Sequence, residues 1–210
     1  MNFDDPRISL HEPLPELANE EVRSRILISG TEEELEKLRV FLDVTAEQII
    51  LFRFYAQQRR KVIDETYIQV ANRKETNPKA TAEEMSMGEY CEYLEPQVRD
   101  AVLTLRKKGY PTYFFGYDKY ASQGIGLMDP FLKNYHPSGD LLCKIEPYDV
   151  DLKVSDEYIG FVCHRGLSLV ELKVIWDFIA EDIPDRGQPA TDSWSGIAEN
   201  FRKRQAKIKK

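Results

Sequence analysis

The spacing of apolar residues along the chain changes from helical to strand-like near residue 110. Between residues 17 and 70, apolar side chains recur every three or four positions, which is typical of one face of a helix. From residue 112 onward, short runs rich in β-branched and aromatic residues are separated by turn residues, which is typical of strands. We therefore expect an α+β fold, with an α-helical N-terminal region before a mostly antiparallel sheet of four to five strands that carries helices on one face.

Two capping boxes mark the starts of helices in the N-terminal region. Thr31 with Glu34 forms the first, and Thr45 with Gln48 forms the second. The second box interrupts a heptad pattern of apolar positions that otherwise runs from residue 35 to residue 70. The apolar stripe is also wider than a strict heptad seam. We therefore predict two helices joined by a tight turn, with one long helix in a coiled-coil dimer as the alternative.

Residues 95–128 hold the clearest helix and strand of the chain. Pro96 suits the first turn of a helix, because the N–H that proline lacks has no partner there. Gly109 suits the left-handed position that follows a helix. Between them, four apolar residues share one helical face: Val98, Ala101, Val102 and Leu105. The pattern predicts a helix beginning at Glu95–Pro96, a strand at 112–117 and a second strand at 125–128.

The remaining pattern predicts three more strands and a covering helix. The strands are expected at residues 141–145, 150–154 and 158–164. The last of these carries apolar residues on both faces, which favours an interior position in the sheet. A capping box formed by Ser168 and Glu171 opens the helix, and Pro184 closes it.

Polar and proline-containing segments suggest four regions along the chain. We predict an extended arm at residues 1–14, a helical region at 15–75, an α+β domain at 80–185, and a linker with a basic C-terminal helix at 186–210. The boundary between the helical region and the α+β domain is expected in the polar segment 72–79, which contains Asn-Pro.

Charge is distributed unevenly along the chain. The formal net charge is −7, yet the last nine residues carry six basic and no acidic side chains. The acidic remainder argues against a broad nucleic-acid surface. The tail allows one alternative, a nucleic-acid-associated protein tethered through Arg202, Lys203, Arg204 and Lys207. The competing interpretation is a solvated helix end whose cations favour the C-terminal end of the helix dipole.

The spacing of cysteines and the absence of long apolar runs exclude several classes of protein and of binding site. The three cysteines are widely spaced without a C-x-x-C pair, which favours buried thiols in a reducing compartment over disulfides or a zinc site. No apolar run reaches the length of a membrane span, and the first residues lack the pattern of a secretory signal. We therefore expect a cytoplasmic protein with no membrane segment, no metal and no cofactor.

Few residues suggest catalysis. Cys163 and His164 are neighbours on a predicted strand, so they point to opposite faces and cannot form a dyad with each other. The acidic turn at 149–157 suits a solvated loop better than a cation site. The enzymatic alternative is a small hydrolase or transferase that combines a histidine with a carboxylate. Its candidate residues are His136 and His164 with Asp118 or Asp129.

The aromatic strand at 112–117 is the strongest candidate for binding. Tyrosines with an apolar ring and a polar end are common at interfaces. The candidate binding residues are Tyr113, Phe115, Tyr117, Lys119 and Tyr120. The competing interpretation is a strand buried on both faces. We interpret the chain as a cytoplasmic interaction protein that uses this strand and its long N-terminal helices, with a second copy or another protein as partner.

Overall fold

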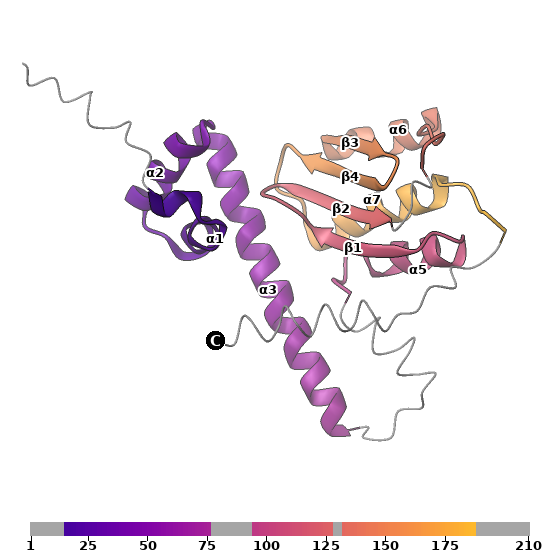
Figure 1. Cartoon of the computed structure of the whole chain (residues 1–210), viewed down its shortest axis with the longest axis horizontal. Coiled ribbons are helices and arrows are strands. Elements are labelled where there is room, and N and C mark those ends of the chain that lie inside the picture. Colours follow the sequence, from indigo (N-terminus) through magenta and orange to yellow (C-terminus); the bar gives the residue numbers. More distant parts are fainter. Residues whose placement is uncertain (1–14, 77–93, 128–131, 188–210) are drawn as a thin grey trace, which may run out of the picture. The chain divides into compact units, whose positions relative to one another are not determined.

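The computed structural model describes residues 15–76, 94–127 and 132–187 (Figure 1). The chain divides into two compact units, Met1–Gln58 and Arg59–Lys210, and the boundary lies inside a long helix, α3. The predicted arm at 1–14, Asp129 and the basic tail with Arg202, Lys203, Arg204 and Lys207 lie outside the described residues. Within the described residues, no helix is long and apolar enough to cross a membrane.

The N-terminal unit consists of helices joined by short turns. A 3-10 turn at Pro15–Ala18 precedes α1 (Glu20–Ser29), α2 (Glu32–Leu42) and α3 (Ala46–Thr76). Both predicted capping boxes are confirmed, since Thr31 and Glu34, and likewise Thr45 and Gln48, exchange side-chain and backbone hydrogen bonds. The break between α2 and α3 is therefore confirmed. The alternative of one continuous helix is wrong.

α3 continues beyond the predicted helix end. The polar segment 72–79 was expected to be a linker, but α3 extends to Thr76. Polar residues such as those at 72–76 are tolerated in a helix, because helix propensity differs by less than about 1 kcal/mol among residues other than proline. The position of a domain boundary in this segment stays a prediction.

The second unit contains a four-stranded antiparallel sheet (Figure 1). Its strands are β1 (Thr112–Tyr117), β2 (Ser122–Leu127), β3 (Val150–Ser155) and β4 (Tyr158–Cys163). They are arranged in the order β1-β2-β4-β3, so β4 occupies the predicted interior position and β1 is an edge strand.

Three helices accompany the sheet: α5 (Arg99–Lys107), α6 (Gly139–Ile145) and α7 (Leu169–Asp182). The strand predicted at 141–145 is wrong, because these residues form α6 and a 3-10 turn, Glu146–Tyr148, follows. The Ser138 hydroxyl caps α6 by accepting from the backbone N–H of Leu141 at 3.1 Å. α5 begins three residues after Pro96. Gly109 has the predicted left-handed conformation, with φ of 92°.

The core of this unit lies between the sheet and the helices. Paired residues in neighbouring strands share a face, and two such rows are Phe115–Ile125–Ile159 and Tyr117–Gln123–Phe161. The ring of Phe161 lies 5.1 Å from that of Trp176 on α7. Four apolar residues of α7 are buried in this core: Leu172, Ile175, Trp176 and Ile179. The face that carries Phe115 and Tyr117 is therefore the core face of the sheet.

Polar side chains link the C-terminal end of α7 to the end of α5 and to the start of α6. Lys108 Nζ donates to the carbonyl oxygens of Ala180, Glu181 and Ile183 at 2.9, 2.8 and 2.6 Å, which caps the C-terminal end of α7. Asp182 accepts from the hydroxyl of Tyr135 at 2.6 Å and from both the hydroxyl and the N–H of Ser138. These contacts hold the start of α6 against the end of α7.

Candidate functional site

The aromatic residues predicted to bind a partner do not lie on one exposed surface. Tyr117 is only 2% exposed and belongs to the core, and Phe115 is partly buried on the same face. Lys119 is exposed in the turn after β1, next to Tyr120, which has a φ of 55°. The side chain of Tyr113 lies outside the described residues. The binding role of the strand stays a prediction.

Asp118 lies beside a tyrosine rather than a histidine. Its Oδ2 is 3.4 Å from the hydroxyl of Tyr158, which also donates to the carbonyl oxygen of Gln123 at 3.2 Å. The phenol end of Tyr158 lies against a pair of glycines in neighbouring strands, Gly124 and Gly160, and a Cβ on either would collide with it. Burial and the nearby Asp118 carboxylate raise the pKa of Tyr158 to about 12.

One of the two candidate histidines, His164, lies beside a carboxylate. This carboxylate belongs to Asp151, which was not among the candidate residues. His164 Nε2 is 3.0 Å from Asp151 Oδ2, and both side chains are about half exposed. His136 is exposed in the loop before α6. Cys163 is buried while its neighbour His164 is exposed, in agreement with their predicted opposite faces. Among the described residues, no group of three or more histidines, cysteines and carboxylates converges on a metal position.

A second polar cluster lies at the edge of the sheet, where the chain approaches α5. Glu95 Oε2 accepts from the backbone N–H of Tyr117 at 2.9 Å and from Gln97 Nε2 at 2.8 Å. Gln97 Nε2 also lies 3.3 Å from Gln123 Oε1 on β2. The Glu95 carboxylate thus accepts a hydrogen bond from an N–H of the edge strand β1. The carbonyl group of a neighbouring strand would accept the same bond. We call Glu95, Gln97 and Gln123 the edge cluster.

The environment of the edge cluster favours the neutral form of its acid. Burial raises the pKa of Glu95, although the positive charge of Arg59 and the hydrogen bonds from Tyr117 and Gln97 act in the opposite direction. Burial and the nearby Glu95 carboxylate also raise the pKa of the Tyr117 hydroxyl. Sequence analysis missed this cluster, because its members are polar residues of ordinary types. The one available signal was Gly116, because a glycine inside a strand often marks a place where another group approaches the backbone closely.

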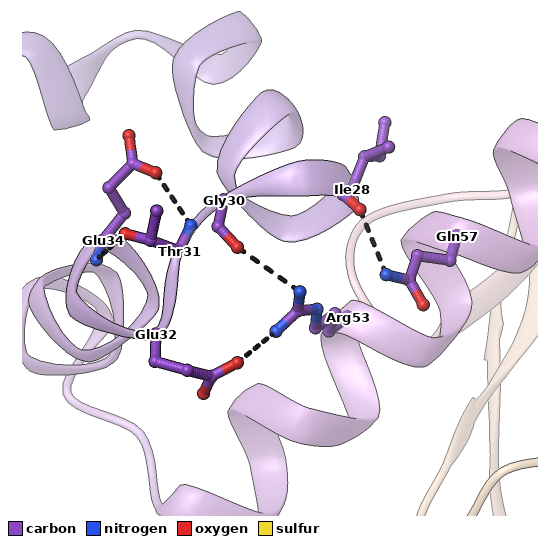
Figure 2. Close-up of polar contacts among 7 residues, drawn as sticks. All are labelled: Ile28, Gly30, Thr31, Glu32, Glu34, Arg53 and Gln57. Atoms are coloured by element: carbon purple, nitrogen blue, oxygen red, sulfur yellow. Dashed lines mark hydrogen bonds and ion pairs between the residues drawn. The ribbon is translucent and has the colours of Figure 1, made fainter.

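In the N-terminal unit, polar side chains of α3 bind the turn between α1 and α2 (Figure 2). Arg53 donates to Glu32 Oε1 at 2.8 Å and to the carbonyl oxygen of Gly30 at 3.3 Å. Gln57, one helical turn further, donates to the carbonyl oxygen of Ile28 at 3.0 Å. These bonds satisfy carbonyl groups near the end of α1 and fix this side of α3 against the turn.

Large apolar side chains of the same unit are exposed. On α3, Ile50 is 67% exposed and Phe54, one turn further, is 41% exposed. Val40 and Phe41 at the end of α2 are also exposed. Because residues four apart lie on one face of a helix, Ile50 and Phe54 form an apolar pair beside the polar contacts of Arg53 and Gln57.

Comparisons with known proteins give no relative from which a function can be transferred. The chain matches no protein-family model, no curated protein and no solved structure.

Proposed function

We propose that this chain is a protein-interaction protein whose N-terminal helical unit binds the partner. The observation that carries the proposal is the exposure of Ile50 and Phe54, one turn apart on α3. Large apolar side chains that are exposed together cost free energy in water, and burying them against a partner recovers roughly 25 cal/mol per Å² of apolar surface. The partner we favour is a second copy of the chain, and the compartment we favour is the cytoplasm.

The contacts made by neighbouring positions on the same side of α3 support this proposal. Arg53 and Gln57 hold α3 against the turn between α1 and α2, so the helix that carries Ile50 and Phe54 is fixed within its own unit. A helix that is already fixed before binding loses little backbone entropy when it binds, which favours affinity. The aromatic strand is a weaker candidate for the binding surface than the sequence suggested, because Tyr117 is part of the core.

Light scattering on the full chain tests the proposal. The chain is expected to show a mass that rises with concentration, and the double variant Ile50→Glu/Phe54→Glu is expected to weaken association at least about tenfold, since each buried apolar anchor contributes on the order of 1–2 kcal/mol. Val170→Glu is the control for placing a charge on an exposed apolar position, because Val170 is 72% exposed on α7. Equal masses for all three proteins at every concentration would contradict self-association through α3.

The pair formed by His164 and Asp151 favours one second candidate, a small hydrolase or transferase. A carboxylate bound to one imidazole nitrogen orients the ring and leaves the other nitrogen available to accept a proton. The test is turnover of a panel of activated esters by the full chain and by His164→Gln. His136→Gln is the control, since His136 is also exposed. Turnover that both variants retain would exclude this role for His164.

A further inference from the structure

The two edge strands of the sheet differ in how far they are protected from pairing with another strand. On β1, the pairing with β2 is irregular between Thr112 and Phe114, and the carboxylate of Glu95 accepts from the N–H of Tyr117. The opposite edge strand, β3, pairs with β4 in a regular register over its whole length (Figure 1). No described strand pairs with the outer side of β3. Irregular pairing and occupied N–H groups discourage a further strand at β1, and β3 has neither protection.

Alternate residues of β3 direct their backbone polar groups away from the sheet. The N–H of His164 donates to the carbonyl oxygen of Asp149 at 3.0 Å, so Asp149 and every second residue after it bond to β4. The N–H and C=O groups of the residues between them point outward: Val150, Leu152 and Val154. Within the described residues, these outward groups have no backbone hydrogen-bond partner. The three side chains are also only partly buried.

The charged residues of β3 are complementary to themselves in one antiparallel register. Asp151 and Lys153 are exposed on the face of the strand opposite to Leu152. If two copies of β3 pair with Leu152 opposite Leu152, Asp151 of each copy lies opposite Lys153 of the other. The neighbouring registers that also use the outward groups are centred on residue 151 or 153, and they place two aspartates or two lysines opposite each other. Like charges directly opposite are unfavourable, so charge selects the register centred on Leu152.

Both charges are available for such a contact. Asp151 binds His164 through Oδ2, and a carboxylate has a second oxygen that accepts hydrogen bonds. Lys153 has no ion pair with a carboxylate among the described residues of its own chain. A second copy therefore supplies the opposite charge that each of these side chains can still bind.

We propose that β3 pairs antiparallel with β3 of a second copy of the chain, so that two sheets become one continuous sheet. The contact is two-fold symmetric, with about six inter-strand hydrogen bonds from the outward groups. It also covers the partly buried side chains of Val150, Leu152 and Val154. This surface is separate from the apolar pair on α3, and the inference does not depend on that pair.

Amide hydrogen exchange of the full chain tests the pairing at residue resolution. The variant Ile50→Glu/Phe54→Glu is used, so that association through α3 does not contribute. The amides of Val150, Leu152 and Val154 are expected to exchange at least about tenfold more slowly when light scattering shows a dimer than when it shows a monomer. Fast exchange at every concentration would overturn the proposal. Slow exchange already in the monomer would also overturn it, because another segment of the same chain would then cover the edge.

Charge reversals in the same variant test the register. Asp151→Lys and Lys153→Asp each place like charges opposite each other twice in the interface, so each is expected to weaken association at least about tenfold. An equimolar mixture of the two reversals is expected to restore the dimer, because every opposing pair then joins opposite charges. Lys133→Asp is the matched control, since Lys133 is exposed outside β3 and is expected to leave association unchanged.

The outcomes separate this interface from the one proposed on α3. A monomeric Ile50→Glu/Phe54→Glu variant at every concentration would overturn pairing through β3 and leave association through α3 standing. A mixture of the two charge reversals that stays monomeric, although thermal transitions show that both are folded, would overturn the register and the proposal with it. Association that is weakened by the reversals and restored in the mixture would support β3 whatever the result for α3.

Discussion

Gly116 is the residue whose replacement this structure restricts most clearly. Its φ of 93° is a conformation that side chains rarely adopt, and a Cβ there would collide with the carboxylate of Glu95. The close approach lets Glu95 reach the N–H of Tyr117 on the edge strand. A single glycine therefore permits the polar contact that closes this end of β1.

Replacing Gly116 by alanine is expected to destabilise the sheet. Backbone strain at such a position costs about 1–3 kcal/mol, and displacement of Glu95 adds the loss of its hydrogen bonds. Chemical denaturation measures the change in the free energy of unfolding. Gly139→Ala is the matched control, because a Cβ at Gly139, the first residue of α6, has nothing within 4 Å. The control is expected to be neutral or stabilising by less than about 1 kcal/mol, and equal losses in both variants would contradict the role of Gly116.

At the scale of elements, capping residues at the helix ends predicted helices more reliably than the spacing of apolar residues did. Local hydrogen bonds set the capping boxes at Thr31, Thr45 and Ser168, so all three were predictable and all are present. The run at 141–145 is too short for its apolar spacing to separate helix from strand. Its helical state depends on the cap at Ser138, which Asp182 holds from 44 residues away. That long-range contact has no local signal.

Lys108 is expected to stabilise the C-terminal end of α7. Lys108→Met keeps most of the apolar stem but removes three hydrogen bonds to carbonyl oxygens. The expected loss in the free energy of unfolding is about 1–3 kcal/mol. Lys107→Met changes the charge by the same amount at an exposed neighbouring position. Similar stabilities of the two variants would mean that the loss comes from charge and not from capping.

Asp182 is expected to make the contact between α6 and α7 sensitive to acid. Burial disfavours its charged form, but the hydrogen bonds from Ser138 and Tyr135 outweigh burial and lower the pKa of Asp182. A carboxyl group whose pKa is lowered by folding stabilises the folded state above its unfolded pKa, about 3.9 for aspartate. That stabilisation is lost as the pH falls through the folded pKa.

Urea denaturation of Asp182→Asn across pH measures this effect. The variant is expected to be less stable than the unmodified chain at pH 7, and the difference is expected to shrink toward zero as the pH falls below about 4. Glu181→Gln, at an exposed neighbour, controls for net charge. A difference that stays constant with pH would show that the charge of Asp182 does not stabilise the contact.

At the scale of the whole molecule, each unit has its own core. Leu35 and Leu38 are buried in the N-terminal unit, and Ile125 and Ile159 are buried in the sheet. Sequence analysis placed most of these apolar positions correctly, since their periodicity follows from the elements themselves. The edge cluster was beyond its reach, because Gln97 and Gln123 are separated by 26 residues and meet only through the fold.

Core variants are expected to loosen one unit at a time. Leu38→Ala is expected to cost about 2–5 kcal/mol and to speed amide hydrogen exchange in α1 and α2, with little effect in β2 and β4. Ile159→Ala is expected to do the opposite. Residue-resolved hydrogen exchange on the full chain measures both. Equal acceleration in both units by either variant would show that they unfold as one.

The contact of Tyr158 with Gly124 and Gly160 provides a spectroscopic marker. Protons close to an aromatic ring are shifted by its ring current, and these glycines lie against the phenol end of the tyrosine. Their α-proton resonances should therefore be displaced from the usual range for glycine. Because the two glycines face each other across β2 and β4, this pair of signals reports the register of the central strands directly. One proton spectrum of a variant would then distinguish a local change from a sheet that has lost its alignment.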